Sequence, residues 1–351
     1  HKLKNCNIYI ITVPTPVKKN YSPDFSFVEQ ATLMVSGILN KGDIVVYEST
    51  VYPGATEEIC VPILEKSSLL FNKDFYVGYS PERINIGDAK NTFKNISKIV
   101  SASNKTTLES LFNLYQSVID AKIYKAPSIK IAEAAKVVEN TQRDINIAFV
   151  NELAMMFSKM KIDTSEVLKA ASSKWNFLNF KPGLVGGHCI GVDPYYLTFR
   201  AEKEGYIPEI ILAGRKLNDS MPEIVSEQIV DLLSHKSNIS QKPEILVLGL
   251  TFKENCPDLR NSKIFDLIDS LEKVTSSIDV YDPWVEKNTD KNNFNLISYP
   301  KDSHYDVIVL AVAHEEFKKM GIEKIKSFGK TDSIYYEIKY LFNKSVIDGR
   351  L

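Results

Sequence analysis

The chain has 351 residues, with 43 Lys and Arg against 44 Asp and Glu, so its formal net charge is -1. This balance gives no electrostatic reason to expect nucleic acid or an anionic membrane as the main partner. Hydrophobic residues make up 44% and charged residues 25%, which is typical of a globular protein of two or three domains. No apolar run is long enough to span a bilayer and no signal peptide opens the chain, so we expect a cytoplasmic protein.

The first third of the chain alternates short apolar segments with amphipathic ones. The pattern predicts strands at residues 6–13, 42–50, 75–80, 97–103 and 121–127. It predicts helices between them at 25–39, 55–65 and 106–118. Strands that alternate with helices indicate a parallel sheet with helices on both faces, which is a doubly wound α/β fold.

The middle of the chain is predicted to be helical. Residues 128–160 are periodic and contain neither Gly nor Pro, so they indicate one long helix that links domains. A helix start signal follows, where Asp163 or Thr164 can cap the helix and Glu166 lies in its first turn. Further helices are predicted at 195–204 and 209–234.

The last part of the chain repeats the α/β pattern. A polar linker at 235–243 precedes strands predicted at 244–252, 277–283, 305–313 and 333–339, with helices between them. The pattern indicates a second Rossmann-like sheet.

The chain has four cysteines, which are widely spaced and include no CxxC: Cys6, Cys60, Cys189 and Cys256. This spacing does not favour a zinc site or a disulfide framework, and we predict no metal. Each cysteine is by default a small buried apolar residue.

Cys189 differs because it lies in the glycine-rich segment GGHCIGVD, residues 186–193. The two glycines permit a tight turn, and Asp193 follows four residues later, where it can orient a water beside the sulfur. Two interpretations stay open: a buried thiol in a turn, or a nucleophile whose pKa is lowered or which has a base beside it. A protease-like pair with His188 is disfavoured because adjacent side chains usually point apart.

Six segments in order give the sequence its strongest signal: VPTP (13–16), ESTVYPG (48–54), SPER (80–83), EAAKVVENT (133–141), GLVGGHCIGVDPYY (183–196) and GLTFKENCPDLRNS (249–262). Together they resemble the UDP-glucose/GDP-mannose dehydrogenase family over essentially the whole chain. The segments GGHCIGVDPYYL and ILAGRKLND (211–219) are most similar to the branch that acts on UDP-N-acetylhexosamines for bacterial surface polysaccharides such as O-antigen and capsule.

The resemblance implies a four-electron oxidation of the C6 alcohol of a UDP-sugar, with two NAD+ used in each turnover. It makes Cys189 the nucleophile that traps the intermediate aldehyde, so that a second oxidation gives a thioester, which water hydrolyses. A thiolate suits this role because it adds readily to an aldehyde and leaves readily from an acyl group.

Five further residues match the family's catalytic positions. Lys136 and Asn140 lie four residues apart, so a helix presents both on one face, where the resemblance implies that they stabilise oxyanions at C6. Thr50 ends a predicted strand and matches the threonine that positions the catalytic water. Glu82 matches an acid/base glutamate, and Asp193 would assist through the same water network. Either carboxylate is alternatively a helix cap or an ion-pair partner.

The predicted substrate contacts also rest on the resemblance. They are Arg83, Phe177, Phe180, Gly183, Lys253 and Arg215, of which Lys253 would meet the nucleotide diphosphate and Arg215 the ligand, across a dimer interface. Ile86 replaces a second glutamate of the UDP-glucose enzymes, which argues against glucose as the sugar. For NAD, the matching positions are Thr15, Ser49, Thr50 and Arg260.

The resemblance implies three domains: a partial N-terminal NAD-binding Rossmann domain at 1–127, a central helical dimerisation and catalytic domain at 128–234, and a C-terminal UDP-sugar-binding domain at 235–351. It also implies a homodimer. The G-x-G-x-x-G turn with which the family grips the NAD pyrophosphate does not occur in these residues, so the first βαβ unit is expected to be missing.

We therefore expect little turnover from this chain alone. An inactive remnant that binds UDP-sugar and dimerises is the alternative interpretation. A two-domain hydroxyacid dehydrogenase is disfavoured because it would have no use for Cys189.

Overall fold

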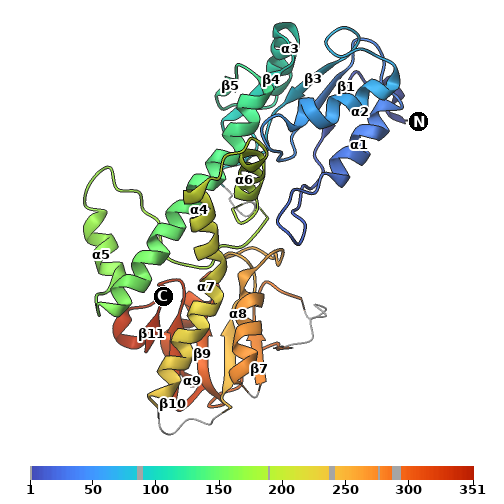
Figure 1. Ribbon diagram of the computed structural model, residues 1–351. Coiled ribbons are helices and arrows are strands. Elements are labelled where there is room, and N and C mark those ends of the chain that lie inside the picture. Colours follow the sequence, from blue (N-terminus) through green and yellow to red (C-terminus); the bar gives the residue numbers. More distant parts are fainter. Residues whose placement is uncertain (1, 85–89, 189, 237–241, 276, 287–293) are drawn as a thin grey trace. The chain divides into compact units, whose positions relative to one another are not determined.

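The computed structural model describes residues 2–84, 90–188, 190–236, 242–275, 277–286 and 294–351 (Figure 1). The chain divides into two compact units. Unit 1 comprises residues 1–142 and 192–209, and unit 2 comprises residues 143–191 and 210–351. Each unit is built around its own sheet.

Unit 1 contains a five-stranded sheet of order β1-β2-β3-β4-β5. Its strands are β1 (Ile8–Ile11), β2 (Ile44–Tyr47), β3 (Tyr76–Tyr79), β4 (Lys98–Ala102) and β5 (Ile123–Lys125). All neighbours pair in parallel except β3 and β4, which are antiparallel. The prediction of a parallel, doubly wound sheet is confirmed except at this pair, which is antiparallel. A parallel pair needs a long crossover, usually a helix, and the described residues between β3 and β4 form no helix.

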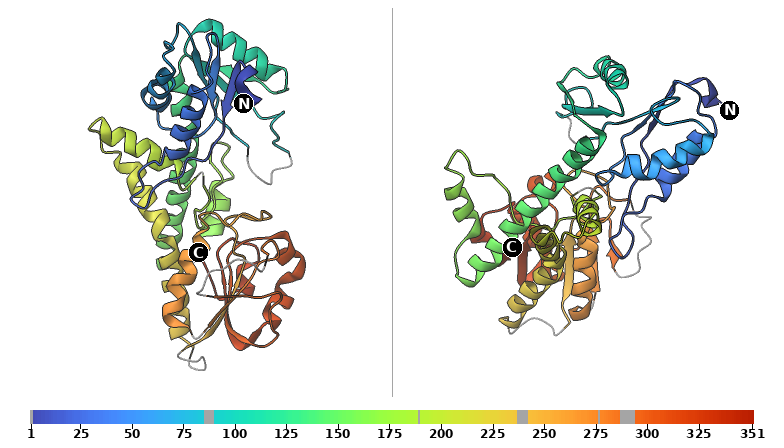
Figure 2. Two further views of the ribbon diagram at one scale, coloured as in Figure 1. Left: turned by 90° about the vertical axis from the view of Figure 1, so that its right-hand side faces the viewer. Right: turned by 45° about the horizontal axis from the view of Figure 1, so that its top comes forward.

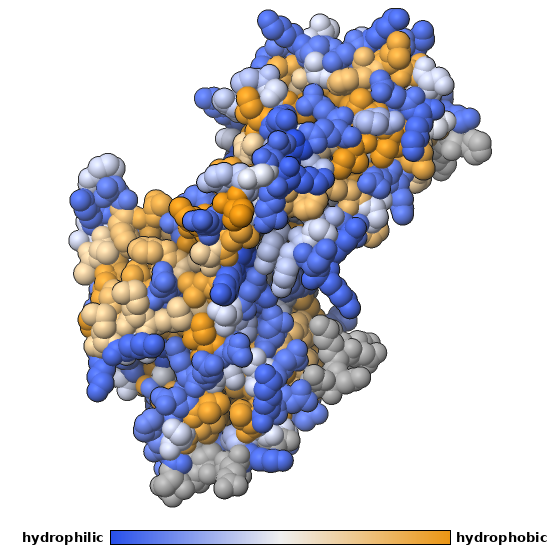
Figure 3. Space-filling view, in the orientation of Figure 1, coloured by the Kyte–Doolittle hydropathy of each residue, from blue (hydrophilic) through white to orange (hydrophobic). Residues whose placement is uncertain are grey.

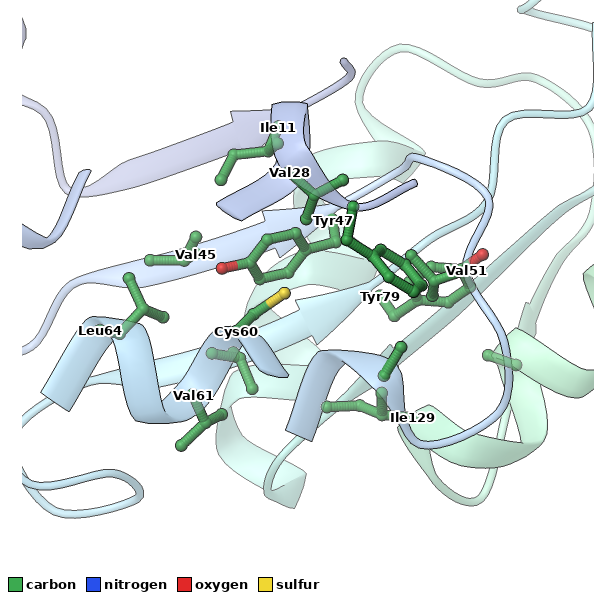
Figure 4. Close-up of a cluster of buried hydrophobic side chains, with 14 of the residues drawn as sticks. Ile11, Val28, Val45, Tyr47, Val51, Cys60, Val61, Leu64, Tyr79 and Ile129 are labelled. Carbon is green, nitrogen blue, oxygen red and sulfur yellow. The ribbon is translucent and has the colours of Figure 1, made fainter. Parts of the chain in front are cut away.

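Helices cover both faces of this sheet. They are α1 (Ser26–Ser36), α2 (Val61–Leu64), α3 (Lys105–Gln116), α6 (Asp193–Lys203) and the first part of α4 (Ile129–Lys159). On one face the strand residues Val45, Tyr47 and Tyr79 pack with Val28 of α1 and Ile129 of α4 (Figure 4). On the other face, α3 packs against Val46 and Val100.

The helix predicted at 55–65 is irregular. It begins as a π-helical turn at Thr56–Cys60 and continues as α2. The change of hydrogen-bond pattern comes just before Pro62, which has no N–H to donate to a regular ladder. Cys60 lies in this turn and is 1% exposed. Burial raises the pKa of its thiol to about 12, which makes Cys60 an apolar core residue.

Unit 2 contains a six-stranded sheet in which every pair is parallel, in the order β11-β10-β9-β6-β7-β8. Its strands are β6 (Glu244–Leu248), β7 (Ser277–Tyr281), β8 (Asn295–Leu296), β9 (Tyr305–Leu310), β10 (Gly329–Glu337) and β11 (Gly349–Arg350). The prediction of a second Rossmann-like sheet is confirmed.

The helices of unit 2 cover both faces of its sheet, as the left-hand view of Figure 2 shows. They are α7 (Glu209–Ser234), α8 (Lys263–Leu271) and α9 (Glu315–Ser327), and unit 2 also contains α5 (Thr164–Ala171) and the rest of α4. Strand residues Val247 and Val309 pack with α7 and α8, whereas Leu248 and Ile308 pack with Phe317 of α9. The predicted cap of α5 is confirmed, because the Asp163 carboxylate accepts from the Ser165 and Glu166 amides.

In unit 2 the strand order changes direction between β6 and β9, since β7 and β8 continue from one side and β10 and β11 from the other. In open parallel sheets, the crevice at such a switch point, beside the carboxyl ends of the strands, is where ligands bind. Residues 249–255 follow β6 and residues 311–314 follow β9, so both segments lie at this edge of the sheet, beside the switch point. Among the described residues, no helix is long and apolar enough to cross a membrane.

Candidate active site

A buried polar cluster in unit 1 joins three of the predicted catalytic residues. Asp193 Oδ2 lies 3.3 Å from Lys136 Nζ and accepts a hydrogen bond of 2.6 Å from Asn140 Nδ2. The three residues are 8%, 5% and 1% exposed for Lys136, Asn140 and Asp193. An ammonium and an amide that converge in a water-poor site are suited to stabilising negative charge on a reacting oxygen.

The cluster owes its geometry to two helices. Lys136 and Asn140 project from one face of α4, as their spacing predicts. Asp193 is the first residue of α6, so the predicted loop ends two residues earlier than expected. Pro194 explains the early start, since Pro is favoured in a first turn, where its missing N–H costs no hydrogen bond. At this helix end the carboxylate also faces the positive pole of the helix dipole.

Thr15, Ser49 and Thr50, which are predicted to contact NAD, lie at the carboxyl edge of the unit 1 sheet. They follow β1 and β2, which pair in parallel, so both segments leave the sheet at the same edge. Ser49 Oγ donates to the Val13 carbonyl at 2.6 Å and ties the two segments together. The Tyr196 hydroxyl donates to the Thr15 carbonyl at 2.9 Å.

The hydroxyl groups of Thr15, Ser49 and Thr50 at this edge suit hydrogen bonds to the ribose and carboxamide parts of NAD. The segment between β1 and α1 contains no glycine, and α1 has no side-chain cap hydrogen bond at its start. These residues therefore do not reproduce the glycine-rich helix N-terminus that holds a pyrophosphate.

Glu82 and Arg83 follow β3. The Glu82 carboxylate accepts from the Ile84 amide, and the Glu82 amide donates to the Glu48 carbonyl at 3.3 Å. The Arg83 guanidinium pairs with Glu139 at 2.5 Å and donates to the Ser97 carbonyl at 3.1 Å. Arg83 is thus held at a fixed place in unit 1. Ile86 lies outside the described residues.

Glu133 was missed by the sequence reasoning as a site residue. It is fully buried on α4, one turn before Lys136, and its carboxylate accepts from the Gly54 amide at 2.5 Å and the Thr56 amide at 2.9 Å. Burial raises the pKa of Glu133, although these hydrogen bonds oppose the rise. Glu133 therefore anchors the segment that contains Thr50 to the helix that contains Lys136. The sequence could have indicated this role, because Glu133 lies three residues before Lys136 and so falls on the same buried face of the helix.

Cys189 lies outside the described residues, but the segment before it is described. The Gly187 amide donates to the Asn261 carbonyl at 3.1 Å, and Asn261 Nδ2 donates to the Gly187 carbonyl at 2.9 Å. Gly187 has φ +81°, and a Cβ on it would lie 2.8 Å from the Phe252 ring. Only glycine fits there without strain. Asn261 and Phe252 therefore fix the chain two residues before Cys189, a role that the sequence alone did not indicate.

The predicted substrate residues of unit 2 lie in two places. Asn151 donates to the Gly183 carbonyl at 3.0 Å and accepts from the Gly183 amide at 2.8 Å, which fixes the end of the segment in which Phe177 and Phe180 are half-buried. Arg215 is 2% exposed and pairs with Asp144 at 2.7 Å and Asp219 at 2.5 Å. Arg215 thus belongs to a buried ion-pair network, and its contact with a ligand stays a prediction.

Lys253 lies in the segment that follows β6, at the switch point of the unit 2 sheet. Asp282 holds this segment, because its carboxylate accepts from the Leu250 amide at 2.6 Å and the Thr251 amide at 3.1 Å. His314, the residue before α9, lies 3.1 Å from Asp282 and accepts from the Asn255 amide at 2.9 Å through Nδ1. Burial tends to raise the pKa of Asp282, but the hydrogen bond from His314 and its backbone donors lower it overall.

Arg260 is 62% exposed at its side chain and donates to Asp258 at 2.6 Å. This contact is the main reason that the pKa of Asp258 is lowered. Among the described residues, no three His, Cys, Asp or Glu side chains gather so that they could hold a metal ion.

Comparison with protein families matches three consecutive parts of the chain. They are the NAD binding domain of the UDP-glucose/GDP-mannose dehydrogenase family at residues 1–119, its central domain at 130–220 and its UDP binding domain at 246–344. These matches support NAD as the cofactor and a nucleotide sugar as the substrate.

Individual relatives agree over nearly the whole chain. The UDP-N-acetyl-D-glucosamine 6-dehydrogenase of Salmonella typhi is 55% identical, over 100% of this chain and 83% of its own length. Protein CapL of Staphylococcus aureus is 50% identical, over 99% and 82%. The solved UDP-D-ManNAc dehydrogenase of Pyrococcus horikoshii superposes with a TM-score of 0.89 at 28% identity, over 99% of this chain and 81% of that one.

None of these similarities supports the expectation that the chain is inactive. The order of the three domain matches, the identity to relatives and the described sheets agree with one another. The chain belongs to the UDP-glucose/GDP-mannose dehydrogenase family, and it is a nucleotide-sugar dehydrogenase.

Proposed function

We propose that this protein is a UDP-N-acetylhexosamine 6-dehydrogenase that converts the C6 alcohol of its sugar to a carboxylate through a thioester on Cys189. The observation that carries the proposal is the buried cluster of Lys136, Asn140 and Asp193. The class of sugar is supported by the similar enzyme of Salmonella typhi, whose name specifies UDP-N-acetyl-D-glucosamine, and by Ile86 in place of a glutamate of the UDP-glucose enzymes.

The proposed reaction has two oxidations and one hydrolysis. NAD supplies the hydride acceptor for both oxidations, and Thr15, Ser49, Thr50 and Arg260 are proposed to hold it. The C6 alcohol loses a hydride and a proton and becomes an aldehyde. The Cys189 thiolate then adds to the aldehyde carbon, and the resulting oxyanion loses a second hydride to give the thioester. Water adds to the thioester, and the C–S bond breaks to release the carboxylate and the thiolate.

Lys136 and Asn140 are suited to the oxyanion that forms on the C6 oxygen as the thiolate adds and again as water adds. A cation and an amide donor held in a buried site stabilise such charge without reorganising. Cys189 lies four residues before Asp193, so the chain itself keeps their Cα atoms within about 14 Å of each other. Thr50 and Glu82 are proposed to position and deprotonate the attacking water, assisted by Asp193.

Six residues are proposed to bind the UDP-sugar. Lys253 follows β6 at the switch point, the kind of place where parallel sheets bind ligands, and a lysine suits a diphosphate. Arg83 is proposed as a further contact. Phe177, Phe180, Gly183 and Arg215 complete the proposed sugar side. We retain the three domain boundaries 1–127, 128–234 and 235–351, a cytoplasmic location and a role in surface polysaccharide synthesis as parts of this proposal.

The Cys189→Ala variant tests the chemistry. With UDP-N-acetylglucosamine or its C2 or C4 epimer, the full-length enzyme is expected to produce two NADH per sugar, followed by absorbance. Cys189→Ala should abolish this turnover because no thioester can form. The Cys60→Ala variant is the matched control, since Cys60 is a core thiol whose loss should leave the chemistry intact. Turnover that survives Cys189→Ala would overturn the thioester mechanism.

A homodimer is the second testable part. Four apolar residues of α4 are each about half exposed: Ile131, Val138, Phe149 and Met156. Their spacings of 7, 11 and 7 residues place them on one face of the helix. In Figure 3, hydrophobic residues also gather around α5 and the neighbouring end of α4. An exposed apolar stripe of this length supports burial against a second copy.

Replacement of both Phe149 and Met156 by Glu should convert a dimer to a monomer, as measured by light scattering during gel filtration. The control is Ile207→Glu, an exposed apolar residue outside α4, which should leave the mass unchanged. A monomeric wild-type protein would contradict the proposal.

A further inference from the structure

Lys98 is a buried lysine for which the proposed chemistry gives no role. It is the first residue of β4 and is 5% exposed. Its ammonium lies 3.2 Å from Glu48 Oε1 and donates to the carbonyls of Ser80 and Pro81, each at 3.3 Å. The three N–H donors of the ammonium thus have three acceptors. A lysine is seldom buried unless its charge is paired in this way.

Aromatic groups complete the surroundings of Lys98. The Tyr115 hydroxyl donates to Glu48 Oε1 at 2.5 Å, and its ring centroid lies 4.8 Å from the ammonium. Phe93 lies on another side, 5.5 Å from the ammonium. Burial lowers the pKa of Lys98, and Arg83 adds to this effect, whereas Glu48 and Glu82 oppose it. Lys98 is therefore held in one position by both polar and aromatic partners.

The acceptors of Lys98 belong to the two segments that contain proposed catalytic residues. Glu48 comes two residues before Thr50, and Ser80 and Pro81 directly precede Glu82. Backbone bonds join the same segments, because the Ser80 amide donates to the Tyr47 carbonyl at 3.0 Å and the Glu82 amide to the Glu48 carbonyl at 3.3 Å. The two carbonyls that Lys98 contacts lie just beyond the end of β3, so Lys98 adds to these backbone bonds.

We propose that Lys98 is a positioning residue that sets Thr50 and Glu82 relative to each other for the hydrolysis of the thioester. Lys98 does not touch the substrate in this role; it acts through the backbone of Ser80 and Pro81 and through Glu48. The inference rests on the proposed function, because Thr50 and Glu82 are its proposed water-handling pair. A displacement of about 1 Å in such a pair costs about a hundredfold in rate.

The test is Lys98→Met in the full-length enzyme, with Lys125→Met as the matched control. Lys125 is on the neighbouring strand β5, pairs with Glu109 at 2.6 Å and lies 3.9 Å from the Phe112 ring centroid. Its side chain is 35% exposed, compared with 6% for Lys98. The control thus removes a lysine with similar partners from a solvated place.

Lys98→Met is expected to lower kcat about a hundredfold and to leave kcat/KM for the UDP-sugar within about twofold, because the slowed step follows both oxidations. The two oxidations precede hydrolysis, so mixing with NAD+ and UDP-sugar should give a burst of two NADH per active site. The acyl adduct on Cys189 should then accumulate and be visible by intact-protein mass spectrometry after an acid quench. Lys125→Met should show wild-type kcat and no burst.

A second variant addresses folding. Lys98→Met leaves the Glu48 carboxylate buried without its cation, so the double variant E48Q/K98M, which removes both charges, is measured in parallel. It should show the same burst, because neither single nor double variant retains the ammonium that holds the Ser80 and Pro81 carbonyls. Loss of folding in both variants, while Lys125→Met folds, would make Lys98 a residue for stability alone and would overturn the inference.

Two failures can be told apart. In the first, the wild type yields two NADH per sugar and this turnover depends on Cys189, but Lys98→Met has normal kcat or reacts slowly without a burst. In that case only the inference about Lys98 fails. If Cys189→Ala retains turnover, the proposed function itself fails, and the inference fails with it.

Discussion

Replacing Asp193 with Asn is expected to lower the free energy of unfolding by about 3–5 kcal/mol. The reason is that the Lys136 ammonium, 8% exposed, would lose the carboxylate that balances its charge 3.3 Å away. Catalysis should fall as well, because the carboxylate also orients Asn140. Urea unfolding followed by circular dichroism measures the first effect, and NADH formation measures the second.

The double variant K136M/D193N separates stability from catalysis. Removing both charges should restore most of the lost stability, since no buried charge then lacks its counter-ion. Its kcat should stay at least about a hundredfold below wild type, because a donor to the C6 oxyanion is missing. Asp266→Asn is the control, as its ion pair with Lys263 at 2.8 Å is half exposed at Asp266 and should contribute less than about 1 kcal/mol. If D193N unfolds at the wild-type urea concentration, Lys136 does not depend on Asp193.

Replacing Glu337 with Gln is expected to change how stability depends on pH. Glu337 is 1% exposed at the end of β10, and burial raises the pKa of its carboxyl from 4.5 to about 7, against the opposing effects of the Phe342 amide and Arg350. The folded state therefore binds this proton more tightly than the unfolded chain does. The stability from this group is complete below pH 4.5 and is lost as the pH rises through 7, which amounts to about 3 kcal/mol.

In Glu337→Gln the side chain is neutral at every pH, so this loss should disappear. The variant should unfold at about the wild-type urea concentration at pH 5 and should be more stable than the wild type at pH 8. Glu323→Gln, an exposed position on α9, is the control and should follow the wild-type curve at both pH values. Equal stability of Glu337→Gln and wild type at pH 8 would show that the carboxylate is solvated when it ionises.

Local patterns in the sequence predicted the five strands of the unit 1 sheet, the four longer strands of the unit 2 sheet and the long helix α4, but not the two-residue strands β8 and β11. Helix starts also depend on neighbours in sequence, so the Asp163 cap could be predicted. Asp193 was expected in a loop, but it is the first residue of α6 because Pro194 favours a first turn. The i, i+4 spacing of Lys136 and Asn140 fixed their common face on a helix. These features need only residues that lie close together in the chain.

Only the tertiary structure decided which distant residues meet. Asp193 lies 53 residues from Asn140, and Tyr115 lies 67 residues from Glu48, which also pairs with Lys98, yet each set shares one buried site. The antiparallel pairing of β3 with β4 and the contact of His314 with Asp282 depend likewise on strand order. A buried polar group needs a partner, but the sequence does not say which one, because packing between elements makes that choice. The sequence by itself therefore determined the family, the elements and the candidate residues, and the fold determined which of those residues share their buried hydrogen bonds.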